Sequence, residues 1–344
     1  MQLAQATLNN WTSVKSANGA PAGKAAETPG GGVDHSNLEI YTPAPEEIVP
    51  EDVKSKTTPL PNKLACGAVI GSGLWLAANI GMQAAATGSI PGAAGVVVGS
   101  LVAAAAGHVA ADLGSGIFHH YIDNYPTYKT PIIGDMAYEF QVHHHKIHDL
   151  ENETIWTNMS AAGKYMWVPM AAVAATSPHW AVQAFTLGMT GGSFIAQGSH
   201  RWTHEKNPPT IAKILQKLHI TQPRESHAIH HKMPWADNYC IVNGMWNPLL
   251  SKTHFFRKWE NLIFNVTGKE PHCWQDPGVK AFAKGEITEE QFLKDQGVNR
   301  KIFREIVKGQ FDAEYERRMA LRAEKRRQIE EAIEARTHKP EDRH

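Results

Sequence analysis

The feature that most constrains this chain is a long stretch without formal charge that begins after its first sixty residues. From Leu64 to Ala111 there is no Lys, Arg, Asp or Glu. A helix needs about 20 apolar residues to cross a bilayer, so this stretch can form two such helices. The segment Thr87-Gly-Ser-Ile-Pro-Gly92 divides it, because glycine and proline interrupt helices. We expect a hairpin of two membrane-spanning helices, with a buried hairpin of a soluble protein as the alternative.

A second uncharged stretch runs from Tyr165 to His200 and contains a turn signal at Thr176-Ser-Pro178. With a rise of about 1.5 Å per residue, each half makes a helix of about 27 Å at most. These halves either just cross a bilayer or form a hairpin buried to partial depth. The two stretches together predict an all-α integral membrane protein with about four transmembrane helices.

Basic residues flank both hairpins and are absent from the turns inside them. Lysines precede the first hairpin and lie between the two hairpins, and Arg201 and Lys206 follow the second. With four spans, all of these basic segments lie on one face. The positive-inside rule assigns that face to the cytosol, or to the stroma of a plastid.

Histidines gather in the segments on the same face. The motifs His227-Ala-Ile-His230-His231 and His200-Arg-Trp-Thr-His204 have the spacing that places rings on one side of a helix. Neutral imidazole is a ligand that suits iron, zinc and copper. The candidate ligands are His119, His143, His144, His200, His204, His227, His230 and His231. Eight donors are more than one four-coordinate ion can use, so the pattern predicts a two-metal site in a histidine-rich helical cap.

Two carboxylates accompany these histidines. Asp112 and Asp123 share one helix face with His119, at the end of an expected membrane span. Charged groups in such positions are costly and are candidates for a functional role. We expect both aspartates, and Asn238, to orient the metal ligands through hydrogen bonds rather than to bind metal themselves. His179 lies at the opposite end of the second hairpin and is interpreted as structural.

The rest of the chain divides into regions by composition. Residues 1–62 are rich in small and polar residues without apolar periodicity, which predicts a disordered arm. Residues 63–276 hold the hairpins and the histidines and form the expected membrane domain. Residues 277–344 are charged with helical periodicity, which predicts a solvated helical tail.

Several classes of function are excluded. The 34 basic residues balance 34 acidic ones, so no overall field favours nucleic acid. Three cysteines without a C-x-x-C pair make a disulfide framework or a zinc-thiolate site unexpected. The chain has no G-x-S-x-G nucleophile motif and no G-x-G-x-x-G after a strand pattern.

A histidine-ligated two-metal site at a membrane face suggests iron that activates dioxygen, with a lipid chain reaching it from the bilayer. Removing hydrogen from an unactivated C–H bond requires a strong oxidant that side chains alone do not provide. No reductase motif is found, so the electrons are expected from a separate carrier.

The histidine motifs resemble the lipid desaturase family that contains plasmanylethanolamine desaturase, CarF and plastid fatty acid desaturase 4. The resemblance covers about residues 100–276. It is carried by the histidine motifs given above together with Ala111-Asp-Leu-Gly-Ser-Gly-Ile-Phe-His119, Phe140-Gln-Val-His-His144 and Asn238-Tyr-Cys-Ile-Val-Asn-Gly-Met-Trp-Asn247. The resemblance implies a diiron, oxygen-dependent enzyme that places a double bond in a chain of an intact phospholipid. It also implies that the eight histidines are both the iron ligands and the catalytic residues.

Local similarity is greatest to the fatty acid desaturase 4 branch, through Ile122-Asp-Asn-Tyr125 and the motifs at Phe140 and Asn238. Acyl desaturation is therefore expected, with vinyl ether formation by a plasmanylethanolamine desaturase as the alternative. The chain departs from the family pattern at Leu150-Glu-Asn-Glu-Thr154, which is acidic where the family usually has a basic stretch. A lipid hydroxylase and a membrane metal carrier remain as other classes.

The resemblance also sets expectations for partners and location. A phospholipid is the expected substrate, and the electron donor is expected to be ferredoxin or cytochrome b5. A thylakoid or bacterial inner membrane is expected, with the endoplasmic reticulum as the alternative. The sequence carries no indication of the oligomeric state.

Overall fold

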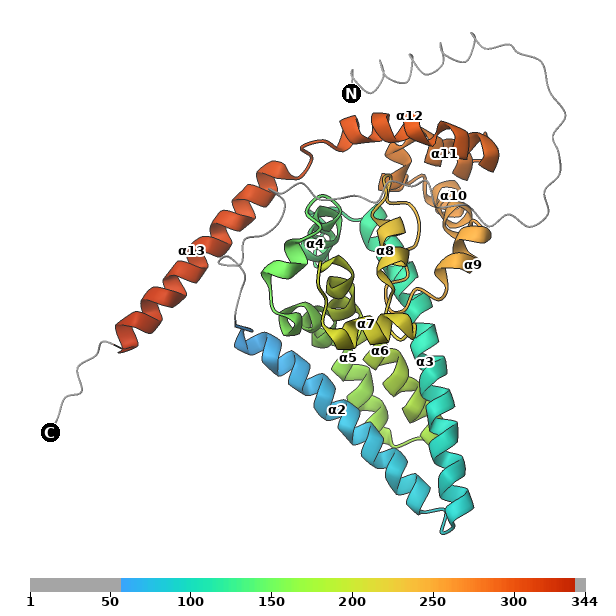
Figure 1. Cartoon of the computed structure of the whole chain (residues 1–344), viewed down its shortest axis with the longest axis vertical. Coiled ribbons are helices and arrows are strands. Elements are labelled where there is room, and N and C mark those ends of the chain that lie inside the picture. Colours follow the sequence, from blue (N-terminus) through green and yellow to red (C-terminus); the bar gives the residue numbers. More distant parts are fainter. Residues whose placement is uncertain (1–56, 338–344) are drawn as a thin grey trace, which may run out of the picture. The chain divides into compact units, whose positions relative to one another are not determined.

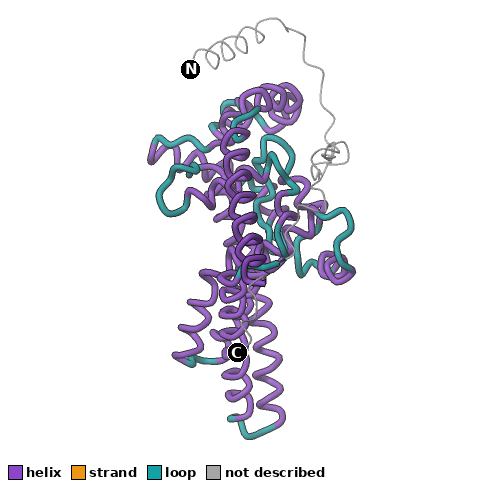
Figure 2. The backbone as a smooth tube through the Cα atoms, turned by 90° about the vertical axis from the view of Figure 1, so that its left-hand side faces the viewer, coloured by secondary structure: helices purple, strands orange, loops and turns teal. Residues whose placement is uncertain are grey.

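The computed structural model describes residues 57–337, and this part of the chain consists of helices and loops without a strand (Figure 2). In chain order the elements are α2 (Leu60–Ala85), α3 (Ile90–Asn124), α4 (Gly134–His143), η3 (Asp149–Asn152), α5 (Ile155–Thr176), α6 (Trp180–His204), α7 (Thr210–Lys217), α8 (Arg224–His230), α9 (Asn247–Lys252), α10 (Phe255–Thr267), η4 (His272–Gln275), α11 (Pro277–Ala283), α12 (Glu289–Val307) and α13 (Asp312–Thr337). The all-α prediction is confirmed. The predicted disordered arm, residues 1–62, falls almost entirely outside the described residues.

The first uncharged stretch forms α2 and α3, and the predicted break between them is confirmed. Ser89 caps α3 by accepting a hydrogen bond from the Gly92 amide. Among the described helices, α2 and α3 are the two that are long and apolar enough to cross a membrane. Their outer surface is apolar, since Leu74, Leu101 and Val102 are 66–68% exposed. Such a surface is stable against lipid chains and costly in water.

The second uncharged stretch lies within α5 and α6, which are longer than expected. They contain 22 and 25 residues and therefore extend about 33 and 37 Å, rather than 27 Å. The difference arises because α5 begins at Ile155, ten residues before the uncharged stretch. Helix α6 is longer because the turn lies before the middle of the stretch and the helix continues four residues past it to His204. The expected turn is present, where Ser177 adopts a left-handed conformation that ends α5.

These four helices form a bundle in which α3 packs on α6, α6 on α5, and α5 on α2 (Figure 1). Its core contains Leu76, Met170 and Phe194. The α2–α3 turn and the α5–α6 turn lie at one end of the bundle, and α4 and α8 to α10 lie at the other end (Figure 1). The bundle thereby carries the ends of α3 and α6, with their histidines, to one side.

Helices α3 and α6 approach each other closely at two glycines. A Cβ atom on Gly188 would lie 1.9 Å from the Ala104 carbonyl oxygen, and one on Gly107 would lie 2.1 Å from the Phe185 carbonyl oxygen. Small residues let helix backbones meet in this way. The Gly95-Val-Val-Val-Gly99 motif does not mediate a backbone contact, since Gly99 faces the ring of Trp180 and Gly95 has open space around it.

Gly188→Ala is expected to destabilise the bundle by about 1–3 kcal/mol, because the new methyl group overlaps the α3 backbone. Gly191→Ala is a matched control on the same helix, since nothing lies within 4 Å of its added Cβ. Alanine is the better helix former, so the control should unfold at the same or a slightly higher temperature. Thermal unfolding in detergent measures both, and equal melting temperatures would contradict the contact.

The C-terminal region is helical through α11, α12 and α13, but it is not simply solvated. Phe303 and Val307 of α12 are buried against Trp235, and the guanidinium of Arg318 lies 3.9 Å from the ring centre of Tyr138. The predicted helical periodicity is thus present. The apolar contacts attach this region to the histidine-bearing end of the molecule.

Candidate metal centre

The structure brings the eight predicted histidines together in two adjoining groups. Within each group, the candidate ligand atoms all lie within 4.8 Å of one another. The first group consists of His143, His200, His204, His227 and His231. The second group consists of His119, His144, His230 and the carboxylate of Asp123.

Two short segments supply ligand candidates to both groups. The α8 segment places His227 and His231 in the first group and His230 in the second. At the end of α4, His143 joins the first group and the next residue, His144, joins the second. The three rings of the α8 motif share a helix side as expected, but they divide between the groups. This sharing places the two groups next to each other.

The ring nitrogens of the first group have the separations expected of ligands around one ion. The Nε2 atom of His204 lies 2.9 Å from that of His227, 3.0 Å from that of His143 and 3.3 Å from that of His200. For metal–nitrogen bonds of about 2.1 Å, neighbouring ligands lie about 3.0–3.4 Å apart. Each neutral imidazole carries a single N–H group, so two such rings can form only one hydrogen bond with each other. A metal ion accounts better for several ring nitrogens that meet at one point.

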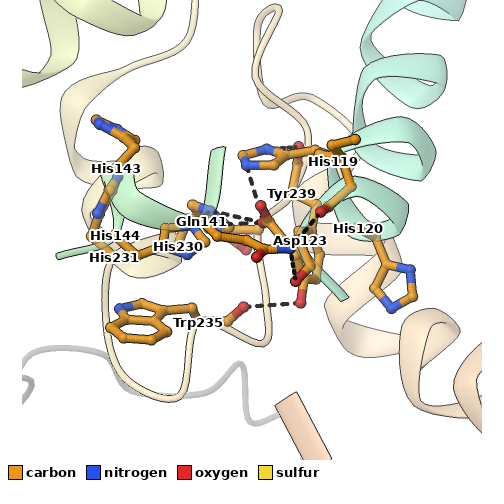
Figure 3. A network of polar contacts seen from close by, with 12 residues as sticks. His119, His120, Asp123, Gln141, His143, His144, His230, His231, Trp235 and Tyr239 are labelled. Atoms are coloured by element: carbon orange, nitrogen blue, oxygen red, sulfur yellow. Dashed lines mark hydrogen bonds and ion pairs between the residues drawn. The ribbon is translucent and has the colours of Figure 1, made fainter. Parts of the chain in front are cut away.

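The second group is completed by a buried carboxylate (Figure 3). Asp123 Oδ2 lies 3.2 Å from Nε2 of His119, 3.6 Å from that of His144 and 3.8 Å from that of His230. Asp123 is 6% exposed, and neither of its oxygens receives a hydrogen bond. A buried carboxylate without a donor is costly unless a cation compensates it. The geometry places Asp123 among the ligand candidates, where we had expected a supporting role.

Backbone carbonyls orient two rings of the second group. The Nδ1–H of His119 donates to the Tyr239 carbonyl at 3.0 Å, and that of His230 donates to the Asp237 carbonyl at 2.9 Å. Since a carbonyl only accepts, the ring proton is on Nδ1 and the Nε2 lone pair faces the group. Hydrogen bonds of this kind fix the tautomer of metal-ligating histidines.

Asp112 and Asn238 hold the loop that provides these carbonyls. Asp112 is fully buried and accepts hydrogen bonds from four backbone amides, those of Val242, Asn243, Gly244 and Trp246. The Asn238 side chain donates to the carbonyl of Ser226, which directly precedes His227. Both residues therefore stabilise the surroundings of the ligand candidates without touching them.

Burial keeps the imidazoles neutral. It lowers the pKa of His227, His231 and His143 well below the ordinary value, and it lowers the pKa of His230 to about 4. The neutral form is the one that binds metal, so these side chains are ready to bind a cation at neutral pH.

The lowered pKa values predict how the stability of the metal-free protein depends on pH. In the unfolded chain the histidine rings take up a proton below about pH 6.5, whereas in the folded protein His230 takes up its proton only near pH 4. Stability therefore falls as the pH drops from about 6.5 to 4, by up to about 1.4 kcal/mol per pH unit for each such histidine. Melting temperatures of chelator-treated protein measure this, and a constant value between pH 7 and pH 5 would contradict it.

Other histidines lie outside the two groups. His120 points away from the site (Figure 3) and its Nε2 lies 2.9 Å from Glu260. His145 contacts Trp235 and Phe311, and His148 pairs with Glu151. His179 is at the start of α6, at the other end of the bundle. None of these belongs to the predicted ligand set.

Sequence reasoning missed one feature of the site and one feature of its surroundings. The orienting carbonyls of Asp237 and Tyr239 belong to the backbone, which the residue pattern does not reveal. The buried Glu260, which pairs with Arg257 at 2.6 Å and accepts from the Trp274 indole, lies beyond the histidine motifs. A glutamate three residues after an arginine on an amphipathic helix is a common surface pattern, so the neighbouring sequence did not indicate that Glu260 is buried.

The arrangement defines a class of protein, namely an all-helical protein with membrane-length helices and two buried histidine groups at one end. Residues 108–274 match the lipid desaturase domain, so this part of the chain is similar to that family. The resemblance inferred from the histidine motifs is therefore confirmed. The matched region contains all eight histidines, Asp112, Asp123 and Asn238.

Individual relatives come from plants, bacteria and animals. The chain is 30% identical over 189 residues to the chloroplastic fatty acid desaturase 4 of Arabidopsis thaliana, covering 54% of this chain and 58% of that protein. It is 30% identical over 185 residues to the plasmanylethanolamine desaturase of Myxococcus xanthus, covering 51% and 64%. It is 29% identical over 193 residues to plasmanylethanolamine desaturase 1 of Mus musculus, covering 52% and 67%. The chain thus spans about three fifths of the plant relative's length, and no solved structure matches it.

Proposed function

We propose that this protein is a membrane-bound, oxygen-dependent diiron lipid desaturase that acts on a chain of an intact phospholipid. The observation that carries the proposal is the convergence of eight buried histidines and Asp123 at one end of a bundle with membrane-length helices. The match to the lipid desaturase domain supports the same function, since the named relatives are desaturases of lipids.

The proposed iron ligands follow from the two groups. The five histidines of the first group would hold one iron, and His119, His144, His230 and Asp123 would hold the other. The mainly nitrogen donor set, with one carboxylate, suits iron. The short Nε2–Nε2 distances and the uncompensated carboxylate of Asp123 support a cation in each group.

Bound iron would supply the oxygen-dependent oxidation that removes two hydrogens from the lipid chain. The protein contributes the surroundings of that chemistry. Burial excludes water and keeps the imidazoles neutral, while the carbonyls of Tyr239 and Asp237 hold the rings of His119 and His230. The electrons would come from a separate carrier, such as ferredoxin or cytochrome b5.

The proposed topology has four spans, with α5 and α6 crossing the bilayer beside α2 and α3. Both hairpin turns lie at one end of the bundle and the histidine groups lie at the other end (Figure 1). The positive-inside rule then places the histidines on the cytosolic or stromal face. A thylakoid or bacterial inner membrane fits this arrangement, with the endoplasmic reticulum as the alternative.

Acyl desaturation is proposed ahead of vinyl ether formation. Support comes from two relatives, the fatty acid desaturase 4 of Arabidopsis thaliana at 30% identity and a fatty acid desaturase 4-like protein at 31% identity. The acidic stretch Leu150–Thr154 is partly engaged within the protein, because Glu151 pairs with His148 and the Glu153 carbonyl accepts a hydrogen bond from Arg201.

Lipid mass spectrometry of a host that expresses the chain tests this function. The expected product is a phospholipid with one new double bond in an acyl chain, formed only in the presence of oxygen. A vinyl ether product would support the plasmanylethanolamine alternative, and a hydroxylated chain would support a hydroxylase. Purified protein should hold about two irons per chain. Readily exchanged metal without any lipid product would indicate a metal carrier and contradict the proposal.

A further inference from the structure

The short helix α7 has an exposed apolar stripe that no other described part of the chain covers. Ile211, Ile214 and Leu218 are spaced three and four residues apart, so they share one helix side. They are 55%, 47% and 62% exposed, and the following Ile220 is 42% exposed. A row of large exposed aliphatic side chains of this kind marks an interaction surface.

The other sides of α7 have different partners. Ala212 is fully buried and attaches the helix to the rest of the protein. Lys213 and Lys217 are exposed and, being four residues apart, form a basic side. The helix therefore presents one side to the protein, one apolar side outward and one basic side. This is the pattern of a helix that lies in the plane of a membrane surface.

The position of α7 agrees with the level of a bilayer boundary. The Nε2–H of His108 in α3 donates to the carbonyl of Ile220 at 2.8 Å, which places the end of the α7 segment beside that residue. His108 lies about 27 Å along α3 from Ile90, close to the hydrocarbon thickness of about 30 Å. In Figure 1, α7 lies across the bundle near the ends of α5 and α6.

We propose that α7 binds an anionic lipid surface, with its apolar stripe inserted among the acyl chains and Lys213 and Lys217 at the phosphate level. The α3 residue beside the α7 segment, His108, lies seven residues after Leu101 and so on the same side of α3, and Leu101 is 68% exposed. The two lysines provide the charge complementarity that selects negative headgroups. The proposal rests on the membrane placement of α3 in the proposed function.

The location of α7 gives this contact a consequence for the site. The helix begins six residues after His204 and ends ten residues before His227, and both histidines belong to the first group. A membrane contact at α7 therefore fixes the height of the first histidine group above the bilayer. This deepens the proposed function by identifying which surface positions the site over the lipid.

Probe depth in nanodiscs tests the proposal on the full chain. Ile214→Cys and Lys213→Cys are labelled with an environment-sensitive fluorophore, since Cys66, Cys240 and Cys273 are buried and therefore protected from reaction. Nitroxide lipids should quench the probe at position 214 at least about twofold more than the probe at position 213, because the two face different sides of α7. Equal, weak quenching at both positions would overturn the proposal.

A third labelled position separates this proposal from the proposed function. Val98→Cys lies on the exposed side of α3, where Val98 is 61% exposed. Quenching at position 98 without quenching at position 214 rejects only the role of α7. Absence of quenching at both positions also rejects the membrane placement of α3.

The composition of the nanodisc tests the preference for negative charge. Discs of phosphatidylcholine alone are compared with discs of equal parts phosphatidylcholine and phosphatidylglycerol. The probe at position 214 should be quenched more in the anionic discs, and the double variant Lys213→Glu, Lys217→Glu should remove that difference. Quenching that is independent of lipid charge would overturn the anionic preference. Cross-linking between two copies through position 214 would assign the stripe to a protein interface instead.

Discussion

Replacing His230 with alanine is expected to abolish product formation and to lower the iron content below the proposed two per chain. His230 supplies one of three ring nitrogens in the second group, and its Nε2 lies 2.9 Å from that of His144. Without it, Asp123 and two histidines remain. Such a set can still bind iron, but with one donor fewer it should hold the second iron more weakly. Loss of a direct ligand is expected to cost more than the 10–100-fold that losing an outer hydrogen-bonding partner costs.

Metal analysis and product analysis of the same preparation measure this effect. His179→Ala is the control, because His179 is exposed at the opposite end of the bundle and should retain both irons and full activity. Membrane insertion of His230→Ala should match that of the control, because the spans are unchanged. Full activity in His230→Ala would remove this residue from the ligand set and contradict the assignment of the second group.

The helices were predictable where they follow from local patterns. The uncharged run from Leu64 to Ala111 predicted a hairpin, and its break was placed correctly because Gly88 takes a left-handed turn conformation and Pro91 stands in the first turn of α3. The lengths of α5 and α6 were underestimated, because a helix can extend past an uncharged stretch. Helix α5 begins nine residues before Lys164, and α6 continues through Arg201 to His204.

The convergence of the eight histidines was predictable from topology, but their division into two groups was not. Helical spacing places His227, His230 and His231 on one side of α8, yet it does not say what each ring faces. That depends on α4 and α6, which pack against the segment from distant parts of the chain. Asp123 was assigned a supporting role for the same reason, since only the three-dimensional arrangement shows its carboxylate among the rings of the second group.

Replacing Asp112 with alanine is expected to produce the largest loss of stability, about 4 kcal/mol or more. Its two oxygens accept hydrogen bonds from four backbone amides in the segment from Val242 to Trp246. Hydrogen bonds to a charged group contribute about 1.5–3 kcal/mol each, and buried donors left without a partner add a further cost. Asp112→Asn should have a smaller effect, because one amide oxygen can still accept while the new NH₂ group opposes a backbone N–H.

The same substitution should make the ligand candidates of the second group less well oriented, although Asp112 contacts none of them. The loop held by Asp112 includes Tyr239, whose carbonyl orients the ring of His119. We expect Asp112→Ala to unfold at a lower temperature in detergent and, in the fraction that stays folded, to hold less iron. Asp135→Ala is the control, since the Asp135 side chain is 88% exposed and should leave both properties unchanged. If Asp112→Ala melts at the wild-type temperature, the loop does not depend on this carboxylate, and the orientation of His119 must have another cause.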